Sequence, residues 1–92
     1  MMLAYAFVAI ADPNRRYILE ELRRHPRTVT ELASGLPISR PAVSQHLKVL
    51  LDAGLVSVEA QGTRRVYSIS SPGFTQLNLW LDQFWSGNLV AK

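Results

Sequence analysis

Two helix signals separated by a tight turn, within residues 28–51, constrain the fold of this chain more than any other feature. Thr28 and Glu31 have the spacing of a capping box, in which each side chain satisfies a free backbone N–H at the start of a helix. Gly35 begins a Gly-Leu-Pro segment that ends this helix. Ser39 is the N-cap of a second expected helix, and the proline in that helix's first turn costs little there. The segment is therefore predicted to form two short helices joined by a turn.

The second of these helices, expected to end at about residue 53, has an apolar and a polar face at a period of 3.6 residues. The polar face holds a serine, a glutamine and a lysine. Glutamine can bond adenine through two hydrogen bonds, serine can bond a base or a phosphate, and lysine neutralises phosphate. This face is typical of a helix that enters the DNA major groove, although the same pattern fits a helical hairpin with a solvated face. The candidate DNA-binding residues on this helix are Ser39, Arg40, Ser44, Gln45 and Lys48.

Two β-prone runs follow at once and favour the DNA-binding interpretation. Residues 55–60 and 66–70 flank a short loop that contains a glycine, which predicts a β-hairpin. Thr63, Arg64 and Arg65 lie at the end of this hairpin, where they would reach the DNA backbone or the minor groove. A helix–turn–helix followed by a basic hairpin is a winged helix–turn–helix. The predicted fold class is mainly α with one β-hairpin, in the order of four helices, two strands and a fifth helix.

The other three helices are expected over residues 3–11, from Pro13 to about residue 25, and over residues 74–89. Asp12 is the N-cap of the second of them, and Pro72-Gly73 is expected to form a turn before the last. Arg15 falls within the apolar arc of its helix, so we expect its stem to pack and its guanidinium to bind a carboxylate or a carbonyl, with a DNA contact as the alternative. A solvated face, with phosphate contact as the alternative, is expected for Arg23, Arg24 and Arg27.

Five blocks of the sequence carry a family resemblance: residues 11–19, 30–33, 44–50, 53–56 and 62–67. In these blocks, which span roughly residues 11–70, the sequence resembles the ArsR/SmtB (arsenical-resistance repressor) family of bacterial transcription factors in order and spacing. The resemblance implies sequence-specific binding of a homodimer to a palindromic operator in double-stranded DNA, and repression of transcription.

Metal sensing, which occurs in this family, is not expected here. Metal-sensing members carry a Cys-x-Cys pair on the first helix of the helix–turn–helix, whereas this chain has no cysteine, which also excludes thiol-based redox sensing. Other members bind zinc through Asp and His on the last helix, where Asp82 stands alone in this chain. Of the two imidazoles, His25 and His46, the second lies on an apolar arc and is expected to be a hydrogen-bonded core residue, with a phosphate contact as the alternative. We therefore expect no metal and no cofactor.

Length and charge agree with one small DNA-binding domain over residues 1–92. The net charge of +3 is mild but consistent with a nucleic-acid partner. No nucleophile–base pair, paired carboxylate or glycine-rich phosphate loop occurs, so the chain is not expected to be an enzyme. The alternative function is a winged-helix module that docks on another protein, and steep salt dependence of binding would distinguish DNA from such a partner.

The terminal helices, over residues 3–11 and 74–89, carry more apolar surface than one small domain can cover, which predicts a two-fold dimer. The candidate interface residues are Leu3, Phe7, Ile10, Leu77, Trp80, Leu81 and Phe84. The apolar start of the chain lacks the basic residues of a signal peptide and is too short to span a bilayer, so a cytoplasmic location is expected. The operator sequence and any effector, whether a small molecule or a protein, are not specified by the residues.

Overall fold

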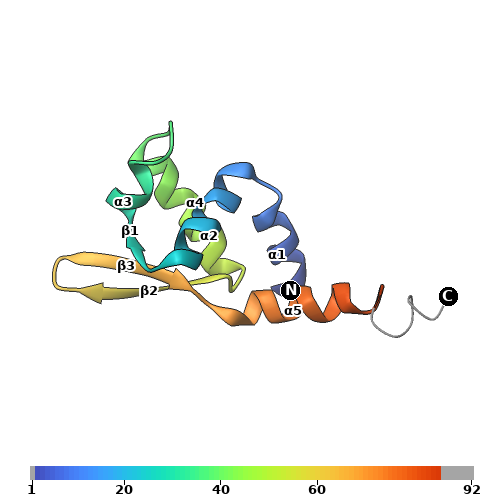
Figure 1. Ribbon diagram of the computed structural model, residues 1–92. Coiled ribbons are helices and arrows are strands. Elements are labelled where there is room, and N and C mark those ends of the chain that lie inside the picture. The colour runs from blue at the N-terminus through green and yellow to red at the C-terminus, as the bar shows by residue number, and fades with distance from the viewer. Residues whose placement is uncertain (1, 86–92) are drawn as a thin grey trace.

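The computed structural model describes residues 2–85, which form five helices and a three-stranded antiparallel sheet (Figure 1). The predicted fold class, mainly α with a β-hairpin after a helix–turn–helix, is confirmed. In chain order the elements are α1 (Met2–Ile10), α2 (Pro13–Arg24), β1 (Arg27–Thr28), α3 (Val29–Ala33), α4 (Arg40–Asp52), β2 (Val56–Gln61), β3 (Arg64–Ile69) and α5 (Ser71–Asp82). Within residues 2–85, none of the helices has both the length and the apolar character needed to cross a lipid bilayer.

Three of the helices begin at the caps that the sequence predicts. Asp12 Oδ1 accepts the backbone N–H of Arg15 at the start of α2, at 3.1 Å. In the capping box of α3, Thr28 N donates to Glu31 Oε1 at 2.8 Å and Glu31 N donates to Thr28 Oγ1 at 3.2 Å. Ser39 Oγ accepts a backbone N–H in the first turn of α4. These local bonds fix where the helix–turn–helix, α3 and α4, begins.

The wing is the antiparallel hairpin of β2 and β3, which projects from the helical body (Figure 1). Gly62, at its tip, has a φ of +64°, a conformation that a glycine adopts without strain. A third strand, β1, pairs with the other edge of β3, so that Arg27 lies opposite Tyr67 and Thr28 opposite Val66. This two-residue strand was not predicted from the sequence. Because Thr28 is also the N-cap of α3, β1 ties the start of the helix–turn–helix directly to the wing.

The core lies between α1, α2 and α4 and the base of the sheet. Its fully buried large side chains come from three helices, α2, α3 and α4, and from the α4–β2 turn: Ile18, Leu32, Val43, Leu47, Leu50 and Leu55. Tyr67 of β3 is buried at the base of the wing, whereas the residues toward the tip are exposed. The buried base anchors the hairpin and leaves its basic end free in solvent.

The start of α5 differs from the prediction. Pro72 and Gly73 do not form a turn before the helix but belong to its first turn, because α5 begins at Ser71. Gly73 N donates to Gly54 O at 2.8 Å, and a Cβ on Gly73 would lie only 2.5 Å from the carbonyl oxygen of Ala53. The missing side chain therefore lets α5 pack directly on the turn that ends α4.

The end of α5 also differs, since the helix ends at Asp82 and residues 83–85 form turns rather than the predicted helix. The predicted helical residues 86–89 lie outside the described part of the chain. Figure 1 shows α1 and α5 side by side at the end of the molecule opposite the wing tip.

Candidate nucleic-acid interface

The two faces of α4 are sorted as the sequence pattern predicts. Val43, Leu47 and Leu50 are fully buried in the core. The polar side chains predicted to face DNA, Ser44, Gln45 and Lys48, are all exposed. Their helix begins with an exposed turn, in which Ser39 and Arg40 are also exposed. The whole predicted recognition face is thus accessible to a ligand as large as a DNA duplex.

A groove of about 420 Å³ joins this helix to the wing. Arg40, from the first turn of α4, lines it together with Thr63, Arg64 and Arg65 of the wing. Arg40 also lines a neighbouring groove with Ser44. The structure therefore brings together two sets of candidate residues that are more than 20 positions apart in the sequence. Arginine binds phosphate through charge-assisted hydrogen bonds, and threonine can donate from its hydroxyl. The groove therefore offers a phosphate four donor side chains, three of them arginines.

The opposite wall of this groove comes from α3, whose residues were not among the candidate binding residues predicted from the sequence. Thr30 and Glu31 line the groove from this side. The hydrogen bond from Thr28 N, together with the nearby positive charge of Arg64, lowers the pKa of Glu31. Its carboxylate therefore stays ionised at neutral pH and partly offsets the wing's charge. The capping box was the signal that placed Glu31 at the exposed start of α3, although it gives no hint of the groove.

Lys48 pairs with Asp52, one turn further along α4, at 3.4 Å. Both side chains are mostly exposed, so this pair contributes little, about 0.3–0.5 kcal/mol for such a helical spacing. A DNA phosphate can therefore take Lys48 away from Asp52 at little cost.

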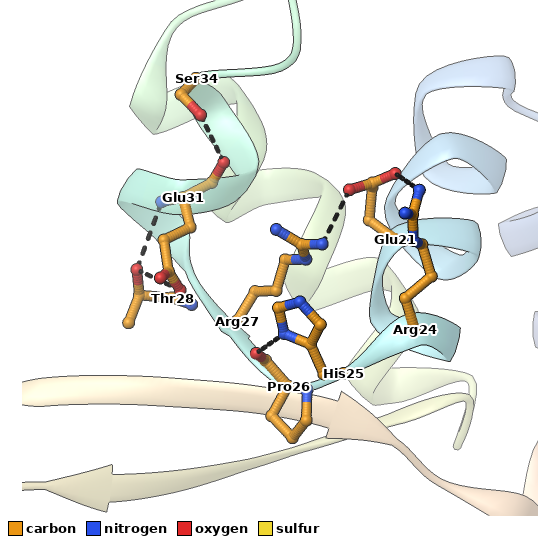
Figure 2. Close-up of polar contacts among 8 residues, drawn as sticks. All are labelled: Glu21, Arg24, His25, Pro26, Arg27, Thr28, Glu31 and Ser34. Atoms are coloured by element: carbon orange, nitrogen blue, oxygen red, sulfur yellow. Dashed lines mark hydrogen bonds and ion pairs between the residues drawn. The ribbon is translucent and has the colours of Figure 1, made fainter.

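Arg27 has a structural role rather than the solvated position predicted for it. Its side chain is only 19% exposed, and its Nη2 lies 3.1 Å from Glu21 Oε1 at the end of α2 (Figure 2). Arg24 approaches the other carboxylate oxygen of Glu21 at 3.9 Å and remains largely exposed. Figure 2 shows the two arginines on either side of this carboxylate, next to the capping box of α3. The prediction for Arg27 was wrong because the β1 pairing draws its side chain toward α2.

Arg15 has the hydrogen-bonded position that the sequence predicts for it, and His46 is hydrogen-bonded as predicted but half-buried rather than within the core. Arg15 Nη1 lies 3.2 Å from His46 Nδ1, and Arg15 also binds two backbone carbonyls of α1. Within residues 2–85, no group of three or more His, Asp or Glu side chains is placed to hold a metal ion. His46 thus has a contact that accounts for its place on the inner side of α4.

Zinc, cadmium or arsenite at stoichiometric concentration is expected to leave both DNA affinity and the thermal midpoint unchanged. A ligand that binds only the folded chain raises its stability by RT ln(1 + [L]/Kd), so a thermal melt is a sensitive test. Melts and DNA titrations with and without each metal make the comparison. A saturable shift of several degrees at one metal per chain would contradict this prediction.

The exposed apolar side chains at the other end of the molecule gather where α1 meets α5. Phe7 packs edge-on against Trp80 with ring centroids 5.1 Å apart, and Trp80 is 4.7 Å from Phe84. These rings and Leu81 are each 36–45% exposed, and together they are called the terminal-helix surface below. Leu3 and Ile10 are partly buried against the chain's own core.

Leu77 differs from the other predicted interface residues, because it is 6% exposed and belongs to the home core. Its side chain holds α5 on its own chain and is not free to contact a partner.

Comparison with known proteins places this arrangement in a family. The model of the family described as "Bacterial regulatory protein, arsR family" matches residues 12–58. The HTH-type transcriptional regulator Rv2034 of Mycobacterium tuberculosis is 53% identical over 86 residues, which are 94% of this chain and 80% of that protein. The transcriptional repressor SdpR of Bacillus subtilis is 33% identical over 78 residues, which are 85% of this chain and 87% of that protein.

A solution structure from Mycobacterium bovis extends the comparison to the fold. It is described as a homodimeric winged helix-turn-helix DNA-binding domain and a possible ArsR-family regulator. The two chains are 27% identical with a TM-score of 0.73, and the match covers 89% of this chain and 80% of the other. Because the matched family consists of regulatory proteins, it also supports a regulator rather than an enzyme. This chain belongs to the arsR family of bacterial regulatory proteins, as a transcriptional regulator that lacks the cysteines of the family's metal sensors.

Proposed function

We propose that this regulator binds a palindromic operator in double-stranded DNA as a homodimer and represses the genes beside it. The observation that carries the proposal is the groove in which Arg40 of α4 meets the wing arginines, Arg64 and Arg65, beside the exposed polar face of α4. Helix and wing thus present one continuous polar surface. In this proposal α4 lies in the major groove, and the wing contacts the phosphate backbone or the minor groove.

Individual roles follow from side-chain chemistry. Gln45 and Ser44 read base edges, because an amide can bond adenine through two hydrogen bonds and a hydroxyl can bond either a base or a phosphate. Lys48 and the arginines neutralise phosphates, which gives affinity without sequence preference. Ser39 caps α4 and Thr63 lies near the wing tip, so both are placed for backbone contacts.

The homodimer forms through the terminal-helix surface in this proposal. Phe7, Trp80, Leu81 and Phe84 leave an apolar patch uncovered on one chain, and a second copy would cover it. The Mycobacterium bovis neighbour is described as homodimeric, which supports this assembly. A two-fold axis here would set two α4 helices about 34–36 Å apart, in successive major grooves on one side of the duplex.

The proposal extends to the domain organisation, the direction of regulation, the cellular location and the effector. Residues 1–92 act as one DNA-binding domain in which α1 and α5 provide the dimer contacts. Repression is favoured over activation because the similar SdpR protein is a repressor. Binding to the bacterial chromosome places the protein in the cytoplasm. An effector, if the protein answers to one, is a small molecule or a protein.

The Gln45→Ala variant tests the role of α4. It is expected to lose about 1–3 kcal/mol of operator binding and to relax the preference at one base position in each half-site. Fluorescence anisotropy with the parent operator, and with operators changed at single positions, measures both effects. If the variant bound every sequence as the parent does, α4 would not be the recognition helix.

The Lys48→Ala and Arg64→Ala variants test the phosphate contacts. Each is expected to weaken binding to all sequences alike and to flatten the slope of log K against log salt by about one unit. Titrations at four salt concentrations give the slope. Parent binding without salt dependence would instead indicate the alternative function, a module that docks on another protein.

A further inference from the structure

The guanidinium of Arg15, in the first turn of α2, contacts two other helices at once. Its Nε donates to the carbonyl of Ala9 at 2.8 Å and its Nη2 donates to the carbonyl of Val8 at 3.0 Å, both in the last turn of α1. Its Nη1 lies 3.2 Å from Nδ1 of His46 on α4. One side chain therefore bridges the end of α1 and the middle of α4.

The contact with α1 supplies hydrogen-bond donors to backbone carbonyls that α1 cannot pair itself. The last four carbonyls of a helix lack partners within the helix, and basic side chains nearby stabilise them. α1 has no basic residue in its last turn. Arg15 and Arg16 supply the missing donors from α2, since Arg16 Nη1 donates to the carbonyl of Ile10 at 2.8 Å. The end of α1 is thereby held in a fixed position on α2.

The donor and the acceptor in the contact with α4 follow from the chemistry of the two side chains. A guanidinium can only donate hydrogen bonds, so His46 Nδ1 must accept, which leaves the ring proton on Nε2. His46 follows Gln45 directly on α4 but is half-buried, on the inner side of the helix. His46 therefore lies on the side of the recognition helix that packs on the rest of the domain.

We infer that the Arg15–His46 contact is a positioning device, which sets the angle of α4 relative to the terminal-helix surface and so selects the spacing between operator half-sites. This inference rests on the proposed function. Phe7 of that surface lies on α1, and the bridge joins α1 to α4 with α2 in between. The dimer axis repeats the Arg15–His46 contact in both subunits. A rotation of α4 at this contact would therefore displace both recognition helices. When the orientation of α4 is fixed, an operator with the wrong half-site spacing binds more weakly. When α4 can rotate, the affinities for the two spacings become similar.

A matched pair of variants at His46 tests the inference. His46→Leu removes the acceptor and keeps an apolar side chain, whereas His46→Asn places an amide oxygen at the δ position, where it can still accept from Arg15. Arg15→Lys is a second disruption, since one ammonium cannot reproduce the three-way fork. Two operators serve as probes. One has its half-sites at the spacing that the parent protein prefers, called the selected spacing, and the other has two more base pairs inserted between the half-sites.

The readout is the ratio of affinities for the two operators, because a loss of folded protein lowers both affinities and cancels in the ratio. The parent and His46→Asn are expected to prefer the selected spacing by about tenfold or more, equivalent to about 1.4 kcal/mol. His46→Leu and Arg15→Lys are expected to prefer it by no more than about threefold, which corresponds to under half of that free energy.

A parent-like ratio for His46→Leu and Arg15→Lys, or a His46→Asn ratio as low as that of His46→Leu, would overturn the positioning role and leave the proposed function intact. A parent that shows no preference for a two-part operator would remove the proposed function and this inference together.

Discussion

Replacing Leu81 by aspartate is expected to convert the proposed dimer into monomers that bind the operator weakly. Leu81 is 38% exposed on one chain, within the terminal-helix surface. Once a second copy covers this surface, the carboxylate would lose its hydration without gaining a partner, at a cost of about 3 kcal/mol or more. Since each 1.4 kcal/mol is a factor of ten, dimer formation should weaken by at least about 100-fold.

Leu79→Asp provides the matched control. Leu79 lies on the same helix but two positions earlier, and so on nearly the opposite side, where it is 61% exposed. The same chemical change there should leave the dimer intact. Sedimentation at micromolar concentration and operator titration, applied to both variants and the parent, measure the difference. A parent that is already monomeric at this concentration yet binds its operator tightly would refute the dimer model.

Gly73→Ala, which adds a single methyl group, is expected to destabilise the folded chain. The new Cβ would lie 2.5 Å from the carbonyl oxygen of Ala53 and 2.6 Å from Leu55 Cδ2. The backbone cannot easily move away, since Gly73 N donates to Gly54 O in the same contact. Overpacking costs about 1–3 kcal/mol, and the better helix propensity of alanine returns about 0.5–1 kcal/mol. The net loss should be about 1–2 kcal/mol.

Thermal melts at one fixed protein concentration measure this loss, which should lower the midpoint by about 4–8 °C per kcal/mol in a domain of this size. Gly35→Ala is the control. Its new Cβ would meet the hydroxyl end of the Tyr17 side chain, which can swing aside, so a smaller loss is expected. A Gly73→Ala midpoint equal to that of the parent would mean that α5 does not pack on the α4–β2 turn as described.

The parts of the fold that were predictable from the sequence are those set by local interactions. The caps at Asp12, Thr28 and Ser39 depend on side chains that bond backbone groups two or three residues away, so spacing alone identifies them. The wing was predictable for the same reason, from two β-prone runs around a glycine. The position of His46 followed from the helix period, because its neighbours on the same arc are apolar.

The features that were missed depend on contacts between distant segments. Strand β1 has two residues, too few for any pattern, and it exists because Arg27 pairs with Tyr67 about 40 positions later. The role of Gly73 depends on packing against the end of α4, which a Pro-Gly pair does not encode. A helical wheel places Leu77 and Trp80 on one side of α5, but only the fold shows that Leu77 is buried in the core and that Trp80 stays partly exposed.

The candidate interface divides in the same way. Its residue types and their place on α4 and the wing came from the sequence, whereas the groove that joins Arg40 to Arg64 required the fold. For Arg15, the backbone carbonyls of α1 are partners of the predicted kind, whereas the imidazole of His46 was not predicted, since nothing local links the two residues.

Selection of bound sequences from a random pool of duplex DNA is the most direct test of the central claim, that two α4 helices read successive major grooves. We predict an enriched palindrome whose half-sites are centred about 10–10.5 base pairs apart. The same selection with Gln45→Ala should lose the preference at one position of each half-site. A pool that shows no enriched motif, or a motif without two-fold symmetry, would contradict the account.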